Sequence, residues 1–132
     1  MKTSYLTSLW DTPDNSRLTA KQFSLRLPVH VSAKIAALCE MYPNKTRTQI
    51  IGDLLTSALE ELEKSLPTKA DFEPVERDPD GQLIFEDIGL RSRFRRLSNS
   101  YYQALEQEIG NEDAPPLFEL PLYISEDGIS FK

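Results

Sequence analysis

The stretch Gln22–Pro28, with the sequence QFSLRLP, decides the fold expected for the first half of the chain. Its residues alternate strictly between apolar and polar, with Phe23, Leu25 and Leu27 on one face and Gln22, Ser24 and Arg26 on the other. An alternation of period two is typical of a strand that buries one face and exposes the other. Because Pro28 ends the pattern, we predict a half-buried strand over residues 22–27.

Two amphipathic helices are predicted to follow this strand. The first carries an apolar stripe at offsets of 0, 4, 7 and 11, formed by Val31, Ile35, Leu38 and Tyr42. Such a stripe is typical of a helix about three turns long, and Pro43 ends it. The second helix is predicted to begin at Thr46, because residues 46–49 fit the S/T-x-x-E/Q capping box. Its stripe is wide and needs partners on more than one side; it consists of Ile50, Ile51, Leu54, Leu55, Ala58, Leu59, Leu62 and Leu66.

A strand followed by two helices leaves a burial problem. The three elements span only about 45 residues, and chains of that size seldom fold alone. The strand also has no partner in the first half of the chain, and an unpaired strand edge is prone to association. Pairing with the same strand of a second copy solves both problems, so we predict a two-fold homodimer. Its expected core consists of Phe23, Leu25, Leu27, Ile35, Leu38, Ile51, Leu54 and Leu55.

These elements resemble the ribbon-helix-helix family of DNA-binding proteins. The resemblance rests on QFSLRLP at 22–28, YPN at 42–44 and KTRTQII at 45–51, and it covers about residues 20–66. It implies a dimer whose paired strands form a ribbon in the major groove, while the second helix points its N-terminus at a phosphate. The family often has a glycine in the turn between the helices, where this chain has Pro43-Asn44-Lys45.

The resemblance assigns base contacts to Gln22, Ser24 and Arg26, and their chemistry suits that task. Arginine can bind guanine O6 and N7, glutamine can bind adenine N6 and N7, and serine can bind either base. The alternative is that these side chains form the solvated face of an edge strand. Phosphate contacts are expected where helix amides and the positive end of the helix dipole attract anions. The residues expected to make them are Lys21, Lys45, Thr46, Arg47 and Thr48.

The charge of the chain is unevenly distributed, although the net value of −6 would by itself argue against nucleic acid. Residues 1–66 hold 8 basic and 7 acidic residues, a net of +1, whereas residues 67–132 hold 7 and 14, a net of −7. Within residues 17–52, six basic residues face only Glu40. The basic segment coincides with the predicted DNA-binding region.

The second half is predicted to form a small acidic α+β module over residues 82–132, after a linker over 67–81 that is rich in Pro, Asp and Gly. Residues 83–85 are a candidate strand, and residues 90–105 carry a helical apolar stripe. The opposite face of this helix is expected to carry Arg91, Arg93, Arg95 and Arg96. Residues 120–124 and 129–131 are expected to pair as a hairpin. Aromatic residues available for a core are Phe85, Phe94, Tyr101, Phe118, Tyr123 and Phe131. The arginines either contact an anion or form a solvated face paired with carboxylates.

Several functional classes are poorly supported by the composition. Cys39 is the only cysteine and His30 the only histidine, which excludes an internal disulfide and the zinc sites built from several such ligands. The chain has no phosphate-binding glycine loop and no H-E-x-x-H motif. No apolar run is long enough to cross a membrane, and no secretory signal is apparent. We therefore expect a cytoplasmic protein without enzymatic activity, cofactor or metal.

The expected protein is an α+β, dimeric, sequence-specific DNA-binding regulator, specifically a bacterial repressor. Residues 1–20 are expected to be a flexible arm whose apolar cluster forms a short helical turn that docks on another surface, with Trp10 as a packing residue rather than a ligand platform. Residues 21–66 are expected to form the DNA-binding and dimerisation domain. Residues 82–132 would contact an effector or a protein partner. Two alternatives stay open: an antitoxin whose second half blocks a toxin, and an adaptor or inhibitor that uses the acidic module as its working surface.

Overall fold

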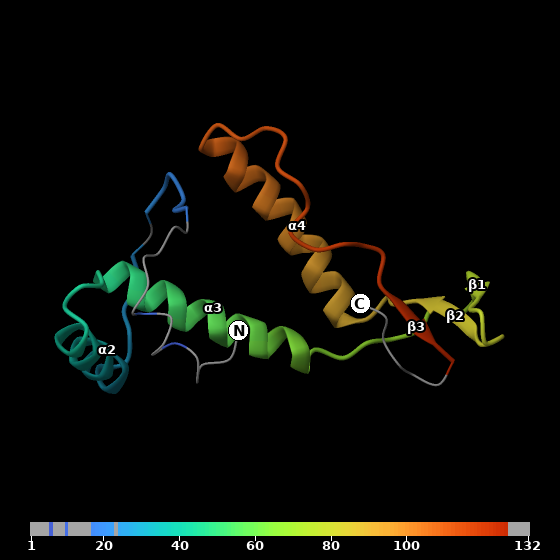
Figure 1. Cartoon of the computed structure of the whole chain (residues 1–132), viewed down its shortest axis with the longest axis horizontal. Helices are drawn as coiled ribbons and strands as arrows, with labels where there is room; N and C mark the ends of the chain where they lie inside the picture. The colour runs from blue at the N-terminus through green and yellow to red at the C-terminus, as the bar shows by residue number, and fades with distance from the viewer. Residues whose placement is uncertain (1–5, 7–9, 11–16, 23, 127–132) are drawn as a thin grey trace. The chain divides into compact units, whose positions relative to one another are not determined.

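The computed structural model describes residues 6, 10, 17–22 and 24–126, and it contains two compact units, Met1–Lys64 and Ser65–Lys132 (Figure 1). The described helices and strands are α2 (Val29–Met41), α3 (Arg47–Ser65), β1 (Glu76–Arg77), β2 (Leu83–Glu86), α4 (Leu90–Glu108) and β3 (Tyr123–Ser125). Helices and a small antiparallel sheet occur together, as the α+β class predicts.

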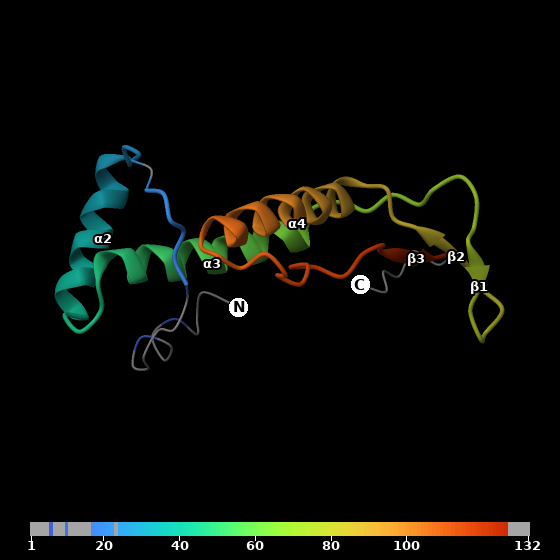
Figure 2. The same ribbon diagram turned by 90° about the horizontal axis from the view of Figure 1, so that it is seen from above.

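The first unit contains the two predicted helices. The helix α2 ends where Tyr42 donates its amide to the Leu38 carbonyl, and a tight turn follows in which the Lys45 amide donates to Tyr42. This turn reverses the chain enough that α2 and α3 run in clearly different directions (Figures 1 and 2). Thus Pro43-Asn44-Lys45 makes the turn without a glycine.

The core of the first unit forms around Ile50, which is completely buried. Leu6 and Trp10 cover it, and Leu38, Cys39, Tyr42 and Leu54 pack against the same cluster. The Trp10 ring meets the Tyr42 ring edge to face, with centroids 5.1 Å apart, and its Nε1 donates to the Asp53 carboxylate over 2.6 Å. The prediction that Trp10 is a packing residue is therefore confirmed, although its hydrogen-bond partner Asp53 is 43 positions away in the chain.

The expectation that the apolar cluster of the arm docks as a short helical turn is confirmed for Leu6 and Trp10, both of which are buried against Ile50. The Trp10 amide donates to the Leu6 carbonyl over 2.9 Å, a helical bond that places both side chains on one face. That face supplies enough apolar area to dock on Ile50. The other residues of 1–16 lie outside the described residues.

The segment expected to be a strand is extended but unpaired in the single chain. Residues 22 and 24–27 are exposed and belong to no strand, and Phe23 lies outside the described residues. A strand is defined by hydrogen bonds to a neighbour, and the predicted neighbour is a second copy. The ribbon and the dimer therefore remain predictions.

The second unit is a three-stranded antiparallel sheet, ordered β1-β2-β3, with α4 inserted in the chain between its second and third strands. The predicted strand at 83–85 and the predicted helix from 90 are confirmed as β2 and α4. Residues 67–81 are not merely a linker, because Glu76–Arg77 pair with β2 and Ala70 forms a bridge with Asp87.

The strand β3 has a partner that the sequence did not predict. Residues 123–125 pair with β2, with Ile124 opposite Phe85 and Ser125 opposite Ile84. This pairing places Ile124 beside Phe85 on one face of the sheet and Ser125 beside Ile84 on the other, and Ile84, Ile124 and Ser125 are all buried. Residues 129–131, the other half of the expected hairpin, lie outside the described residues, so the hairpin itself stays a prediction.

A close approach of two backbone segments fixes the start of α4. The buried Asp87 carboxylate accepts the amides of Lys69 and Gly89, each over 2.8 Å. The Ile88 amide donates to the Lys69 carbonyl and the Arg91 amide to the Pro67 carbonyl. A Cβ on Gly89 would lie 2.6 Å from the Lys69 nitrogen, so only glycine fits here.

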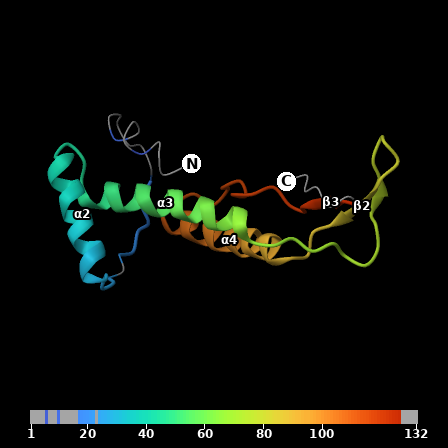
Figure 3. The same cartoon turned by 90° about the horizontal axis from the view of Figure 1, so that it is seen from below.

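After α4 the chain returns alongside the helix to β3 (Figure 3). Asn99 holds this return segment by a reciprocal pair of hydrogen bonds with the Phe118 backbone, over 3.0 and 2.8 Å.

The predicted role of Tyr101 in the core is wrong, because its side chain is exposed while Ser92 and Glu106 are buried. Hydrogen bonding to the return segment turns the Asn99 side of the helix inward. Phe85, Phe94, Phe118 and Tyr123 are half-buried, and Phe131 is outside the described residues.

Candidate nucleic-acid interface

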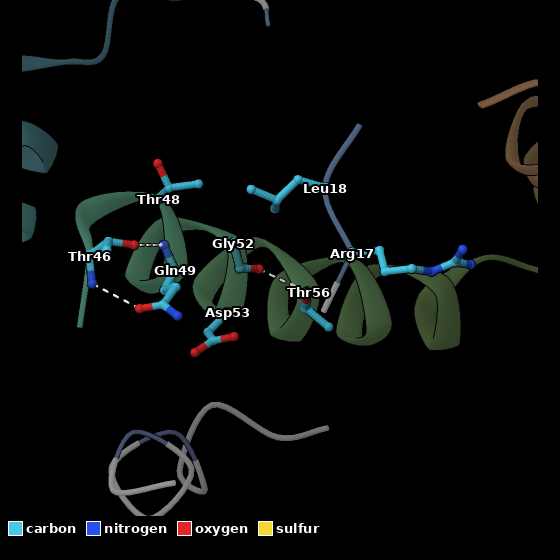
Figure 4. Close-up of a pocket in the computed structure, with 8 residues that line it drawn as sticks. All are labelled: Arg17, Leu18, Thr46, Thr48, Gln49, Gly52, Asp53 and Thr56. Carbon is cyan, nitrogen blue, oxygen red and sulfur yellow. Dashed lines mark hydrogen bonds between the residues drawn. The ribbon is translucent and has the colours of Figure 1, made fainter. Parts of the chain in front are cut away.

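The N-terminal end of α3 is organised by the predicted capping box, which is confirmed. The Gln49 amide donates to Thr46 Oγ1 over 3.1 Å, and the Thr46 amide donates to Gln49 Oε1 over 2.9 Å (Figure 4). The first helical bond follows, from the Ile50 amide to the Thr46 carbonyl. The amides of Arg47 and Thr48 lie between these bonds, in the turn where helix amides have no acceptor within the helix. That arrangement favours an anion at this end of α3.

A shallow groove of about 590 Å³ runs along this end of the helix (Figure 4). It is lined by Arg17, Leu18, Thr46, Thr48, Gln49, Gly52, Asp53 and Thr56. Arg17 brings a positive charge to the groove from outside α3, and the Asp53 carboxylate in the same groove accepts the Trp10 hydrogen bond. Hydroxyl, amide and guanidinium groups thus share the lining with apolar surface, and the one carboxylate is already hydrogen-bonded.

The expected phosphate-contacting residues are divided between two places. Lys45, Thr46, Arg47 and Thr48 are contiguous at the start of α3, where Thr46 to Thr48 are exposed and Lys45 is half-buried. Lys21 lies in the extended segment before α2 and is exposed. Four of the five expected residues are thus at one helix end, and the fifth is on the segment expected to form the ribbon.

The expected base-contacting residues Gln22, Ser24 and Arg26 are all exposed on the extended segment. They do not line the groove at α3, which Arg17 and Leu18 approach instead. From the sequence, Arg17 was expected only to add to the positive charge of residues 17–52. No local pattern identifies it as a neighbour of α3, because some thirty residues separate the two in the chain.

The residues expected to form a dimer core differ in burial within the single chain. Ile35 is buried, and Leu38, Ile51 and Leu54 are half-buried. Leu25, Leu27 and Leu55 are exposed, by 62, 37 and 54%. Three large apolar side chains thus lie at the surface of a small unit, on the segment and the helix that the expected dimer would cover.

Two of the four arginines of α4 have contacts within the second unit. The Arg95 guanidinium lies 4.9 Å above the centre of the Phe118 ring, and Arg96 is 4.0 Å from the Glu86 carboxylate. These contacts favour the solvated, carboxylate-paired interpretation of the cluster over a dedicated anion site.

Comparisons of the chain with protein-family models, with curated proteins and with solved structures gave no match. Over the part of the chain that the structure describes, no helix has the length and apolar character needed to cross a membrane. No group of three or more His, Cys, Asp and Glu side chains suited to a metal ion occurs among residues 6, 10, 17–22 and 24–126.

Proposed function

We propose that this protein is a dimeric, sequence-specific DNA-binding regulator that acts as a repressor. The single observation that carries the proposal is the capped N-terminus of α3, where Thr46 and Gln49 form the capping box and Lys45 and Arg47 flank Thr46. A helix end with unpaired amides and two flanking cations is suited to a DNA phosphate. Arg17, which lines the adjoining groove, adds a third cation.

The exposed segment before α2 supports the readout part of the proposal. Gln22, Ser24 and Arg26 alternate with apolar residues, and Leu25 and Leu27 are exposed in the single chain. Pairing of this segment with its copy would bury the leucines on one face and present the three polar side chains on the other. A two-stranded ribbon of this kind fits the major groove of DNA.

The acidic second unit is expected to act away from the DNA. Residues 67–132 carry a net charge of −7, and DNA phosphates would repel it. In this proposal the first unit binds the operator, and the second unit serves assembly or regulation.

Selection from fragments of the host genome tests the proposal directly. The full-length protein should enrich specific fragments over bulk competitor at physiological salt. Arg26→Ala should lower specific affinity by about 1–3 kcal/mol for each base that the arginine no longer binds, while affinity for random DNA falls much less. Lys45→Ala should weaken binding to all sequences and reduce the salt dependence by about one unit for each phosphate that is no longer neutralised.

Lys64→Ala is the matched control for Lys45→Ala. Lys64 is a cation in the last turn of the same helix, about 25 Å from its start at 1.5 Å per residue. Its removal should leave DNA affinity unchanged. If the full-length protein selects no fragment over competitor, the regulator proposal is wrong, and an adaptor or inhibitor that uses the acidic module becomes the better interpretation. If Arg26→Ala and Lys45→Ala lose affinity equally for operator and random DNA, the assignment of Arg26 to base readout is wrong.

A further inference from the structure

The helix α4 exposes a continuous apolar stripe that its own unit does not cover. Leu90, Leu97, Tyr101 and Leu105 are 52, 48, 69 and 41% exposed. At 100° per residue these four positions fall within an arc of about 80°, so they lie in one row along the helix. Ser92 and Glu106 are buried instead, so α4 packs on its own unit with a different side.

Charge along α4 is divided between its two halves. The first half contains Arg91, Arg93, Arg95 and Arg96 and no acidic residue. The second half contains no basic residue and ends at Glu108; its other carboxylate, Glu106, is buried and accepts a hydrogen bond from Asn111 within the same unit. The helix is therefore positive at the end where its stripe starts with Leu90 and negative at the end where the stripe finishes with Leu105.

We propose that the stripe of α4 binds the same stripe on a second copy of this chain, with the two helices antiparallel. An antiparallel pair places the arginine-bearing half of each helix beside the glutamate-bearing half of the other. A parallel pair would place like charges together at both ends, which is destabilising. The antiparallel arrangement is also two-fold symmetric, so one surface is complementary to itself.

The expected register follows from the ends of the stripe. Leu90 of one copy lies beside Leu105 of the other, and the symmetry axis passes close to Leu97. The two copies of Leu97 are then neighbours, whereas the two copies of Leu90 are about 22 Å apart along the axis, at 1.5 Å per residue.

Pairing through α4 does not depend on DNA binding, because α4 is separate from the residues proposed to contact DNA. If the first unit also forms a dimer, the two α4 helices that pair belong either to the same dimer or to two different dimers. Sedimentation velocity of the full-length protein distinguishes the two by mass, and a monomeric mass at every concentration would overturn the pairing.

Disulfide cross-linking of the full-length protein tests the pairing and its direction together. Cys39→Ser removes the only native cysteine, and each new cysteine is then introduced at one exposed position of the stripe. Leu97→Cys should give a covalent dimer under mild oxidation. Leu90→Cys alone should not, because a disulfide requires Cα atoms within about 7 Å. A mixture of Leu90→Cys protein and Leu105→Cys protein should give a mixed covalent dimer.

Three outcomes would overturn the proposal. The pairing is wrong if Leu97→Cys does not cross-link although circular dichroism shows a folded protein. The direction is wrong if Leu90→Cys cross-links to itself as efficiently as Leu97→Cys. A second copy is the wrong occupant if, in cells, Leu97→Cys forms its disulfide with a different protein.

Two substitutions that need no cysteine chemistry complete the test. Leu97→Asp should lower the association constant of α4 pairing tenfold or more, since a buried leucine is replaced in each of the two copies. Gln103→Asp is the matched control, because Gln103 is exposed on another side of the same helix and should leave association unchanged. Equal effects of the two variants on the sedimentation profile would overturn the assignment of the stripe as the contact surface.

Discussion

Removal of the Asp53 carboxylate should release Trp10 from the core of the first unit. The Trp10 Nε1 donates to this carboxylate over 2.6 Å, and the ring also packs against Tyr42. Hydrogen bonds to charged groups contribute about 1.5–3 kcal/mol, so Asp53→Ala should raise the fraction of molecules with Trp10 undocked about tenfold to a hundredfold. The indole would also lose its acceptor in a partly buried site, which adds to the cost of docking.

Tryptophan fluorescence measures this directly, because Trp10 is the only tryptophan in the sequence. Asp53→Ala should shift the emission maximum to longer wavelength and increase quenching by acrylamide, while far-ultraviolet circular dichroism changes little. Glu61→Ala is the control, because Glu61 is an exposed carboxylate on the same helix and should leave both signals unchanged. The reasoning is refuted if emission and quenching are the same in the native protein and both variants.

Three further predictions concern local features. Thr46→Ala should lower the free energy of unfolding of the first unit by about 1 kcal/mol in urea denaturation, because the helix loses its cap. Thr48→Ala, which does not belong to the capping pair, should change this free energy much less. Equal effects of the two variants would contradict a capping role for Thr46. Gly89→Ala should destabilise the second unit by about 1–3 kcal/mol, because its Cβ would lie 2.6 Å from the Lys69 nitrogen. Gly52→Ala should instead stabilise α3 by up to about 1 kcal/mol, because a Cβ at Gly52 would have nothing within 4 Å. Thermal unfolding of both variants tests this contrast. Leu25→Asp should abolish the dimerisation proposed for the first unit, and a variant whose mass by light scattering equals that of the native protein would show that Leu25 is not in the interface.

Local signals predicted the helices of this protein well. The apolar stripe before Pro43 and the capping box at Thr46 each depend on residues within one or two helical turns, and both are present where the sequence places them. The grouping of four expected phosphate-contacting residues at the start of α3 follows from the same local pattern. The cap and the basic residues next to it are adjacent in sequence, so their arrangement depends little on contacts with distant parts of the chain.

Features that depend on contacts distant in sequence were predicted poorly. The docking of Trp10 on Ile50 and Asp53, the approach of Arg17 to α3 and the pairing of β3 with β2 all join segments far apart in the chain. The prediction that Tyr101 belongs to the core was wrong for a related reason. The apolar stripe of α4 suggested an inward face, but the hydrogen bonds between Asn99 and Phe118 determine which side turns inward. The strand at 22–27 requires a partner that a single chain does not supply.

The contact between Trp10 and Asp53 has a consequence for synthesis on the ribosome. The two residues are 43 positions apart, so at about 5–20 residues per second the tryptophan is made roughly 2–9 s before its acceptor. During that interval Leu6 and Trp10 have no Ile50 to cover, and they form an apolar pair open to chaperones or to neighbouring nascent chains. The first unit can therefore close its core only after the first turns of α3 have left the exit tunnel.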